Sequence, residues 1–429
     1  MRDLVSYTIL AWLQNIAAAF PAPIKLTLLQ LILGIASSTS GHISSILLDL
    51  NTDKHWTTYY KAVRKGRFSL KKIRIAWAAL CIACRFKSLS SRIVIAVDDT
   101  LVFRSSKNAP DADSHYDHSH KNNTVDFPLS QSYVALFFIS RRDEKPAAIP
   151  ASLFLMQNKG NRSKLDVALN LTSRLKNQAQ DRDFLLLTDS WFMKSTLLLP
   201  LIDIGVHCLG PIRKDSVLHL PPVRKAGRGR PRRYGQKLSL DFVQDHFLLN
   251  HVEVFAYGKT RHFELYCVDA QVRFLKGRIS RIVYCRFQND DGSKTPWQTL
   301  LSTDLSLGAA EIIRHHASRW AVEPAFNELK NTFGLKQAWQ QSRKALIRWA
   351  TFISIAHGLA ALTSLIFSKD LAEISPIPWR KGKPMTAGWA ARALGSIFRN
   401  VDLSSLASLT SKKTSTPEPS NDTSLNKIA

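Results

Sequence analysis

Three acidic side chains, far apart along the chain, have the residue type and the local setting of a metal-dependent phosphoryl-transfer site. Asp98 follows the β-branched run RIVIAV and Asp189 follows DFLLLT, so each comes at the end of a predicted buried strand. In open α/β sheets, functional side chains gather at the carboxyl ends of strands. Glu323 lies later, in a segment with helical spacing. Carboxylates in this arrangement suit two divalent cations about 3.5–4 Å apart, which is the requirement for phosphoryl transfer on DNA.

Asp99 competes with Asp98 for the first position in this set. Adjacent side chains in a strand point to opposite faces, so only one of the two faces the site. We prefer Asp98 because it ends the strand directly, and Asp99 stays open as the alternative. Mg²⁺ keeps several waters and needs only one or two protein ligands per ion, so three acids are enough for two ions. Mn²⁺ is the expected substitute.

The segment around Glu323 places two cations beside the acid. At about 100° per residue, His316, Arg319, Glu323 and Lys330 fall within one stripe roughly 60° wide. An ordinary helix face with salt bridges would give the same spacing, so the stripe alone leaves both interpretations open. Pro324 disfavours helical angles at Glu323, which predicts a kink or a new helix start there.

The charge of the chain points to a polyanionic partner. Its 429 residues contain 59 Lys and Arg against 33 Asp and Glu, a formal net charge of +26. Each phosphate neutralised by such a surface releases a counterion, so double-stranded DNA is the first candidate partner. A membrane surface and a merely soluble basic surface are the alternatives. Five cysteines, an odd number in a chain this long, exclude a disulfide framework.

The densest basic segment runs from residue 213 to residue 237, with nine Lys and Arg against one Asp. Arg228-Gly229-Arg230-Pro231 within it has the pattern of an AT-hook core, which lies in a narrow minor groove. The alternative is a solvated loop that touches phosphates without sequence preference. We expect DNA contacts from Arg228, Arg230, Arg232 and Arg233. Arg104 and Lys107, shortly after Asp98, are further candidates for phosphate contacts.

The order of predicted elements indicates an α/β fold with a mixed sheet flanked by helices. We expect five regions: a helical N-terminal, DNA-binding region (1–90), the first part of a catalytic core (91–210), a β-rich insertion with the basic loop (211–303), the C-terminal helices of the core (304–368), and a basic, partly disordered tail (369–429). The apolar run 350–367 contains Ser, Thr, His and Gly, so we expect a buried helix rather than a membrane span. The expected location is the cytoplasm, in association with the nucleoid.

The set VDDT, LLLTDSW and H-x2-R-x3-E-x6-K resembles bacterial insertion-sequence transposases of the DDE type, in the branch with a Tyr-Arg-Glu-Lys signature around the third acid. The resemblance covers roughly residues 92–340, including the β-rich insertion. It implies an RNase H-like core, two metal ions bound by Asp98, Asp189 and Glu323, and cleavage and strand transfer at transposon ends. Arg319 and Lys330 would then hold DNA phosphates, and two protomers would pair on two DNA ends.

The chain departs from this family at one position, because His316 stands where the signature has tyrosine. Histidine is shorter than tyrosine and can carry a charge, although it can still hydrogen-bond a phosphate. Trp320, beside Arg319, has the chemistry to stack on an extruded base, and a core tryptophan is the alternative. Two other functions remain open: an RNase H-like nuclease or resolvase that cuts without joining, and a catalytically inactive DNA-binding relative.

Overall fold

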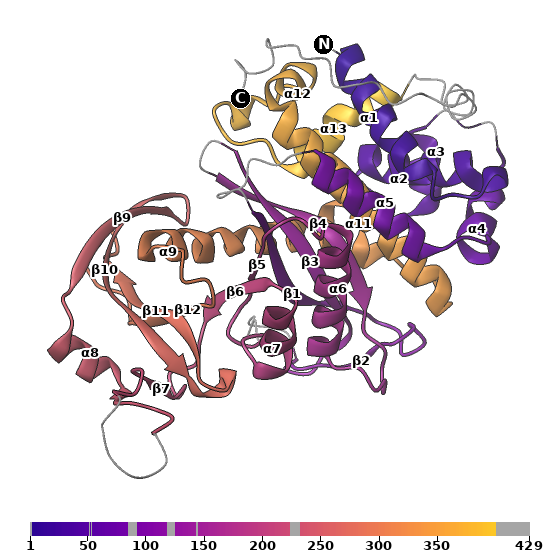
Figure 1. Cartoon of the computed structure of the whole chain (residues 1–429). Coiled ribbons are helices and arrows are strands. Elements are labelled where there is room, and N and C mark those ends of the chain that lie inside the picture. The colour runs from indigo at the N-terminus through magenta and orange to yellow at the C-terminus, as the bar shows by residue number, and fades with distance from the viewer. Residues whose placement is uncertain are drawn as a thin grey trace.

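The computed structural model describes residues 2–50, 52, 54–84, 92–117, 125–142, 145–223 and 232–399. A five-stranded core sheet has the order β4-β3-β1-β5-β6 (Figure 1). β1 and β3, and β3 and β4, pair antiparallel, whereas β1 and β5, and β5 and β6, pair parallel. The bounds are β1 Ile93–Phe103, β3 Leu129–Arg142, β4 Lys145–Leu155, β5 Phe184–Leu187 and β6 Val206–Pro211; the two-residue β2, Asp113–Ser114, pairs with β3.

The parallel part of the sheet is formed by short apolar runs that are buried on both faces. All four residues of β5 are buried, as are Val94 to Val97 of β1, as expected for strands covered by crossover helices. The crossovers are α6 (Lys164–Gln178) and α7 (Ser195–Asp203). α6 begins with a capping box in which Ser163 and Asp166 bond each other's backbone. The predicted mixed α/β sheet is confirmed, and its strand order and directions are consistent with an RNase H-like fold.

The β-rich segment after β6 does not stand apart from this sheet. Its last strand pairs antiparallel with β6, so the insertion extends the core sheet to twelve strands in the described part of the chain. Figure 1 shows it as a lobe at one end of the core. Its elements are β7 Leu218–His219, β8 Lys237–Leu238, α8 Leu240–His246, β9 Asn250–Ala256, β10 Lys259–Val272, a 3-10 turn Arg273–Leu275, β11 Arg278–Phe287 and β12 Gln298–Ser302. Arg92, just before β1, pairs with Asp304, just after β12.

A helical layer from both ends of the chain covers the β4 edge of the sheet (Figure 1). At its centre is α11 (Arg343–Ile366), which packs on β4, α2 and α13. The other helices are α1 Arg2–Ala17, α2 Lys25–Ser38, α3 Ile43–Leu48, α4 Trp56–Lys65, α5 Leu70–Ala83, α12 Ser368–Ile374 and α13 Ala387–Phe398, with 3-10 turns at Ala22–Ile24, Leu335–Gln337 and Pro378–Arg380. Among the described residues, α11 alone has the length and apolar composition of a membrane span, and 89% of its apolar window is buried in this layer.

The N-terminal helices share their core with α11. Arg348 on α11 donates to the carbonyl oxygens of Val63 and Gly66, at 2.8 and 2.6 Å. Gly358 on the same helix allows the ring of Trp77 to approach so closely that an added Cβ would lie 2.2 Å from it. The indole nitrogen of Trp77 donates in turn to Pro150 O of β4, at 2.7 Å. The N-terminal region is therefore built into the same body as the sheet, and its expected role in DNA binding remains a prediction.

Candidate active site

Asp98 and Asp189 come at equivalent positions on neighbouring parallel strands. Ala96 of β1 is opposite Leu187 of β5, and each acid follows its partner of that pair by two residues. Paired residues of a parallel ladder share a face, so a distance of two residues returns both acids to one face. The negative charge of Asp189 is near enough to raise the pKa of Asp98. The prediction that Asp98 ends its strand is wrong, because β1 continues to Phe103, whereas Asp189 does lie just past the end of β5. The pairing of β1 with β5 nevertheless brings the first two predicted acids together.

Asp98 faces the side of the sheet where α10 (Val322–Asn327) lies. Across the β1–β3 ladder Ala96 is opposite Phe137, and the ring of Phe326 on α10 packs edge-on against Phe137, with centroids 5.1 Å apart. Asp98 has the same strand parity as Ala96 and therefore points to the same face. The third predicted acid, Glu323, is carried by the helix on that face.

Asp99 points to the opposite face. Its carboxylate accepts a hydrogen bond of 2.5 Å from Nζ of Lys164, at the start of α6. Asp98, in contrast, accepts from Nη1 of Arg319 at 2.9 Å and from its neighbour's backbone N–H at 2.8 Å. Alternation along β1 thus separates the two acids, and Asp98 is the one that shares its surroundings with Asp189 and α10.

The electrostatic setting of Asp98 favours a proton or another cation. Burial, together with the nearby charge of Asp189, raises the pKa of Asp98 to about 7, although Arg319 acts to lower it. The side chain is 19% exposed and that of Arg319 is 15% exposed. Water therefore screens their interaction only partly.

The segment that carries Glu323 is helical but not one regular helix. It consists of α9 (Ala309–Ser318), a 3-10 turn (Arg319–Ala321), α10, and a π turn (Glu328–Thr332). A 3-10 turn advances about 120° per residue instead of 100°, so three such residues shift the helical phase by roughly 60°. The irregular turn comes just before Pro324, where a proline in an α-helix would lose a backbone hydrogen bond. The single stripe expected from regular spacing is therefore broken between Arg319 and Glu323.

Glu323 is exposed. Within the described residues, no group of three or more Asp, Glu, His or Cys side chains is close enough to hold a metal ion. Asp98 and Asp189 by themselves fit a hard divalent cation, because two partly buried carboxylates side by side are the oxygen ligands that such an ion prefers. The structure thus brings together two of the three predicted ligands and leaves the third on the adjacent helix.

Two family comparisons agree with this geometry. The family model described as DDE superfamily endonuclease matches residues 24–246, which is more than half of the chain. The chain belongs to this superfamily. A second family model, described as transposase DDE domain, matches residues 153–357 and includes Asp189 and Glu323. No curated protein matches the chain closely enough to be reported as a relative. Together the two matches support a transposase-type function, and DDE transposases act on DNA and generally use divalent metals.

In this member of the DDE superfamily, His316 borders a cavity that was not predicted from the sequence. The cavity has a volume of about 460 Å³, and its wall includes Ser190, Arg213, Lys214, Tyr257, Trp297 and His316. Ser190 directly follows Asp189, so the cavity adjoins the candidate metal ligands. Burial, with the nearby charge of Arg319, lowers the pKa of His316 to about 3, so the imidazole is neutral at physiological pH. His316 Nδ1 is buried and has no hydrogen-bond partner in the described part of the chain.

Trp320 is not a core residue. Its side chain is 52% exposed, and it packs edge-on against Tyr257, with ring centroids 6.2 Å apart. Tyr257 has a positive φ of 54° in the turn between β9 and β10, so the insertion extends an aromatic side chain over the start of α10. Nothing in the sequence around Tyr257 indicated this contact. It depends on how the turn between β9 and β10 packs against Trp320, which is distant in the sequence.

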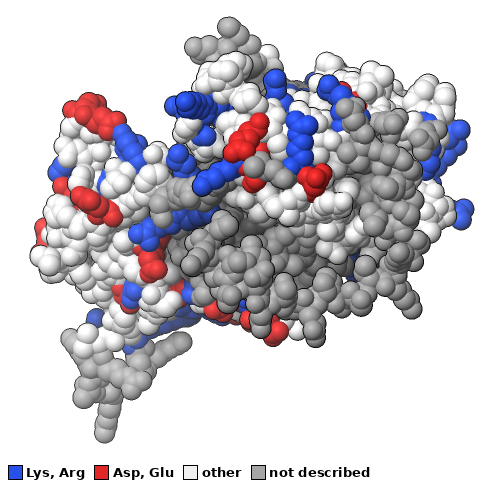
Figure 2. All heavy atoms as spheres, turned by 90° about the horizontal axis from the view of Figure 1, so that it is seen from above, with Lys and Arg blue, Asp and Glu red and all other residues white. Residues whose placement is uncertain are grey.

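The predicted basic DNA contacts have different outcomes. Arg228 and Arg230, in the AT-hook pattern, lie outside the described residues. Arg232 and Arg233 are exposed, and Arg233 donates to the backbone oxygen of Lys276 at 3.1 Å. Figure 2 shows Lys and Arg side chains gathered over the middle of the face seen from above.

Arg104 is a structural residue rather than a phosphate contact, so the prediction for it was wrong. It is 6% exposed. Its guanidinium donates to the side chain of Gln131 at 2.8 Å and to the carbonyl oxygens of Leu335 and Lys336, at 3.2 and 2.7 Å. Arg104 therefore ties the end of β1 to the turn that follows the Glu323 segment.

Proposed function

We propose that this chain is an insertion-sequence transposase that cleaves DNA at transposon ends and joins them to a target, with Mg²⁺ or Mn²⁺ as cofactor. The observation that carries the proposal is the pair of partly buried acids, Asp98 and Asp189, each two residues after Ala96 and Leu187, which are paired on adjacent parallel strands. The family comparisons support DNA as the substrate class.

Asp98, Asp189 and Glu323 are the residues proposed to hold the metal ions. Bound there, divalent cations supply activation of the attacking oxygen and stabilisation of the leaving oxygen. Glu323 is exposed on α10, on the same side of the sheet as Asp98, so it is available to the pair when DNA is bound. Asp99 is the weaker candidate because Lys164 neutralises it on the opposite face.

The chain's own cations are proposed to position the DNA. Arg319 and Lys330 bind phosphates near the cut, and Trp320 offers an exposed ring to an unstacked base. His316 is a neutral imidazole, so it would bind the DNA by a hydrogen bond and not by a positive charge. These residues correspond to the Tyr-Arg-Glu-Lys branch, with histidine in place of tyrosine, and we propose that the chain belongs to that branch.

Transposition joins two DNA ends, and we propose that two protomers pair on them and that Arg228, Arg230, Arg232 and Arg233 contribute DNA contacts. The net charge of +26 supports such extended contact with a polyanion. A protein of this kind would work in the cytoplasm, in association with the nucleoid.

The experiment is a plasmid assay in which the DNA flanking the coding region brackets a marker gene. With purified protein and Mg²⁺, excised marker and marker joined to a second plasmid are the expected products. Cut DNA without joined products would favour a nuclease or resolvase. DNA binding without cutting, in either Mg²⁺ or Mn²⁺, would favour an inactive DNA-binding relative.

A further inference from the structure

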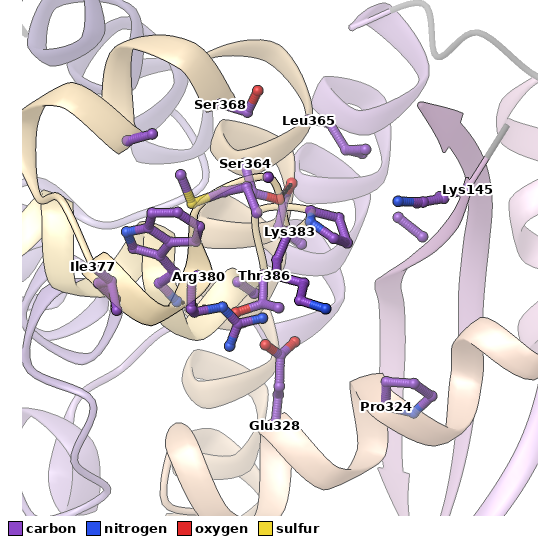
Figure 3. A pocket seen from close by; sticks show the side chains of 18 of the residues that line it. Lys145, Pro324, Glu328, Ser364, Leu365, Ser368, Ile377, Arg380, Lys383 and Thr386 are labelled. Carbon is purple, nitrogen blue, oxygen red and sulfur yellow. Dashed lines mark hydrogen bonds between the residues drawn. The ribbon is translucent and has the colours of Figure 1, made fainter. Parts of the chain in front are cut away.

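A second cavity, apart from the candidate metal ligands, lies between the sheet and the C-terminal helices. Its volume is about 780 Å³. One wall is the start of β4 at Lys145, the floor includes Pro324 and Glu328, and the other wall is the loop between α12 and α13 (Figure 3). None of these residues was predicted from the sequence to have a functional role.

Most residues that line this cavity are small or apolar, but its charged side chains are mainly basic. Among the described residues, the lining includes the cations Lys145, Lys369, Arg380, Lys381 and Lys383 and a single acid, Glu328. Glu328 is already engaged by the backbone N–H of Gly388 and by His357, at 3.1 and 3.2 Å.

The cations on the wall are not engaged in this way. Within the described residues, no carboxylate forms an ion pair with any of the four lysines, and Arg380 Nε is buried without a hydrogen-bond partner. Figure 3 shows Arg380 and Lys383 on one side of the opening and Lys145 on the other. Counting only the residues that the structure describes, cations outnumber acids in the lining and lie on two walls, which suits an anionic occupant.

The loop on the far wall is a preformed basic turn. Lys381-Gly382-Lys383-Pro384 has the same basic-Gly-basic-Pro pattern as residues 228–231. Gly382 has a φ of +73°, and the N–H of Lys383 donates to Arg380 O at 2.9 Å, so the loop is folded rather than extended. A folded turn is unlike an extended strip that inserts into the minor groove. Lys381 and Lys383 are exposed on this turn at the cavity, where lysines can contact phosphates. Trp379, beside it, is 80% exposed.

This cavity is continuous with the surface near Arg319. A neighbouring hollow of about 560 Å³ shares Pro146, Ala321 and Pro324 with it and extends to Tyr257 and Trp320. In the sequence, Ala321 lies two residues after Arg319, and Pro324 directly follows Glu323. A DNA strand that lies along both hollows would therefore pass within about one helical turn of Glu323, the proposed third metal ligand.

From these observations we propose that the cavity between β4 and the α12–α13 loop binds the phosphate backbone of the DNA duplex next to the cut, with Lys145, Arg380, Lys381 and Lys383 as the contacts. The inference rests on the proposed function for the identity of the polyanion. A free phosphate would not need cations on two walls, nor a groove that leads to the candidate active site.

The first test is lysine footprinting of the full chain. The protein is treated with an acetylating reagent, with and without a 40-base-pair duplex (roughly four helical turns) in EDTA, and each lysine is quantified by mass spectrometry. Lys145, Lys381 and Lys383 are expected to be protected by DNA. Lys344, exposed at the opposite end of α11, is the matched control and is expected to stay reactive. Equal acetylation of the cavity lysines with and without bound DNA would overturn the proposal.

The second test uses the double variant Lys381→Ala/Lys383→Ala. Loss of two phosphate contacts should flatten the slope of log Kd against log salt concentration by about 1.8. Lys381→Arg/Lys383→Arg should keep the wild-type slope, and Lys344→Ala should leave it unchanged. An unchanged slope in the double alanine variant, with DNA bound by wild type, sinks the inference alone. Wild-type protein that binds DNA through these lysines but never cuts it overturns the proposed function instead.

Discussion

Nη1 of Arg319 donates a hydrogen bond of 2.9 Å to Oδ2 of Asp98, so the first candidate metal ligand is already paired with a cation. The pair joins β1 to the 3-10 turn before α10, from positions 221 residues apart. Arg319 was expected from the family resemblance to hold a DNA phosphate. One guanidinium has enough N–H donors for both partners. Arg319 can therefore exchange its hydrogen bond to Asp98 for one to a phosphate when DNA and metal bind.

Arg319→Gln should therefore change metal binding and DNA cleavage in opposite directions. Removal of a positive charge beside Asp98 should strengthen binding of Mn²⁺ by about tenfold. Loss of the phosphate contact should reduce cleavage by about a hundredfold or more. Calorimetry at about pH 8.5 measures the first effect, because Asp98 is then ionised. Arg319→Lys keeps the charge and is the control for the first effect. Weaker metal binding in Arg319→Gln would contradict this account.

Single substitutions of the acids separate the proposed ligands from their neighbour. Asp98→Asn, Asp189→Asn and Glu323→Gln should each reduce DNA cleavage by about a thousandfold, because each removes an anionic oxygen from the metal site. DNA binding in EDTA should remain within about twofold of wild type. Asp99→Asn is the matched control and should retain cleavage, because Asp99 faces Lys164. Retained cleavage in Glu323→Gln would remove that residue from the site.

Gly358→Ala tests whether the N-terminal helices are part of the same core as α11. The added Cβ would lie 2.2 Å from the Trp77 ring, so α5 or α11 must shift. We expect a loss of about 1–3 kcal/mol in the free energy of unfolding, measured by urea denaturation. Trp77→Leu in the same chain should make the alanine less harmful, with a coupling energy of about 1 kcal/mol or more. If the losses of stability in Gly358→Ala and Trp77→Leu simply added in the double variant, the close packing of Trp77 on Gly358 would be contradicted.

The sequence predicted the apolar, parallel-paired parts of β1 and β5, because each is a short run of a kind that forms buried parallel strands. It did not predict that β1 continues past Asp98 to Phe103, because the polar residues there pair with β3, whose position the local pattern does not give. It also predicted the mixed sheet, which depends on the order of local patterns, whereas the choice of Asp98 over Asp99 as a metal ligand stays a prediction. The Arg319–Asp98 pair and the burial of Arg104 were not predictable in this way. Each depends on contacts between residues more than 200 positions apart.

Irregular backbone limited the prediction for Glu323. Regular helical spacing placed it in one stripe with Arg319, but the 3-10 turn that precedes Pro324 changes the phase between them. The β-rich insertion was recognised from its strands, whereas its pairing through β12 to β6 was not. Pairing partners of distant strands are set by register over the whole sheet, and a single sequence carries little information about them.

Glu328 gives the structure a pH-dependent contribution to stability. Burial acts to raise the pKa of Glu328, but hydrogen bonds from His357, Gly388 and Thr386 outweigh it and lower the pKa below the ordinary value of 4.5. These bonds join the π turn to α11 and α13. An acid with a lowered pKa in the folded state stabilises the fold above its unfolded pKa, and this contribution is lost as the pH falls through the folded pKa.

Glu328→Gln should therefore destabilise the protein by about 1–3 kcal/mol at neutral pH, and the difference from wild type should shrink as the pH falls below about 4.5. Urea denaturation of both proteins between neutral pH and pH 4 gives this difference directly. Glu373→Gln, at an exposed position on α12, is the control and should show little effect at either pH. A deficit in Glu328→Gln that stays constant as the solution is acidified would mean that the Glu328 charge contributes no stability, and that only the shape of its side chain matters.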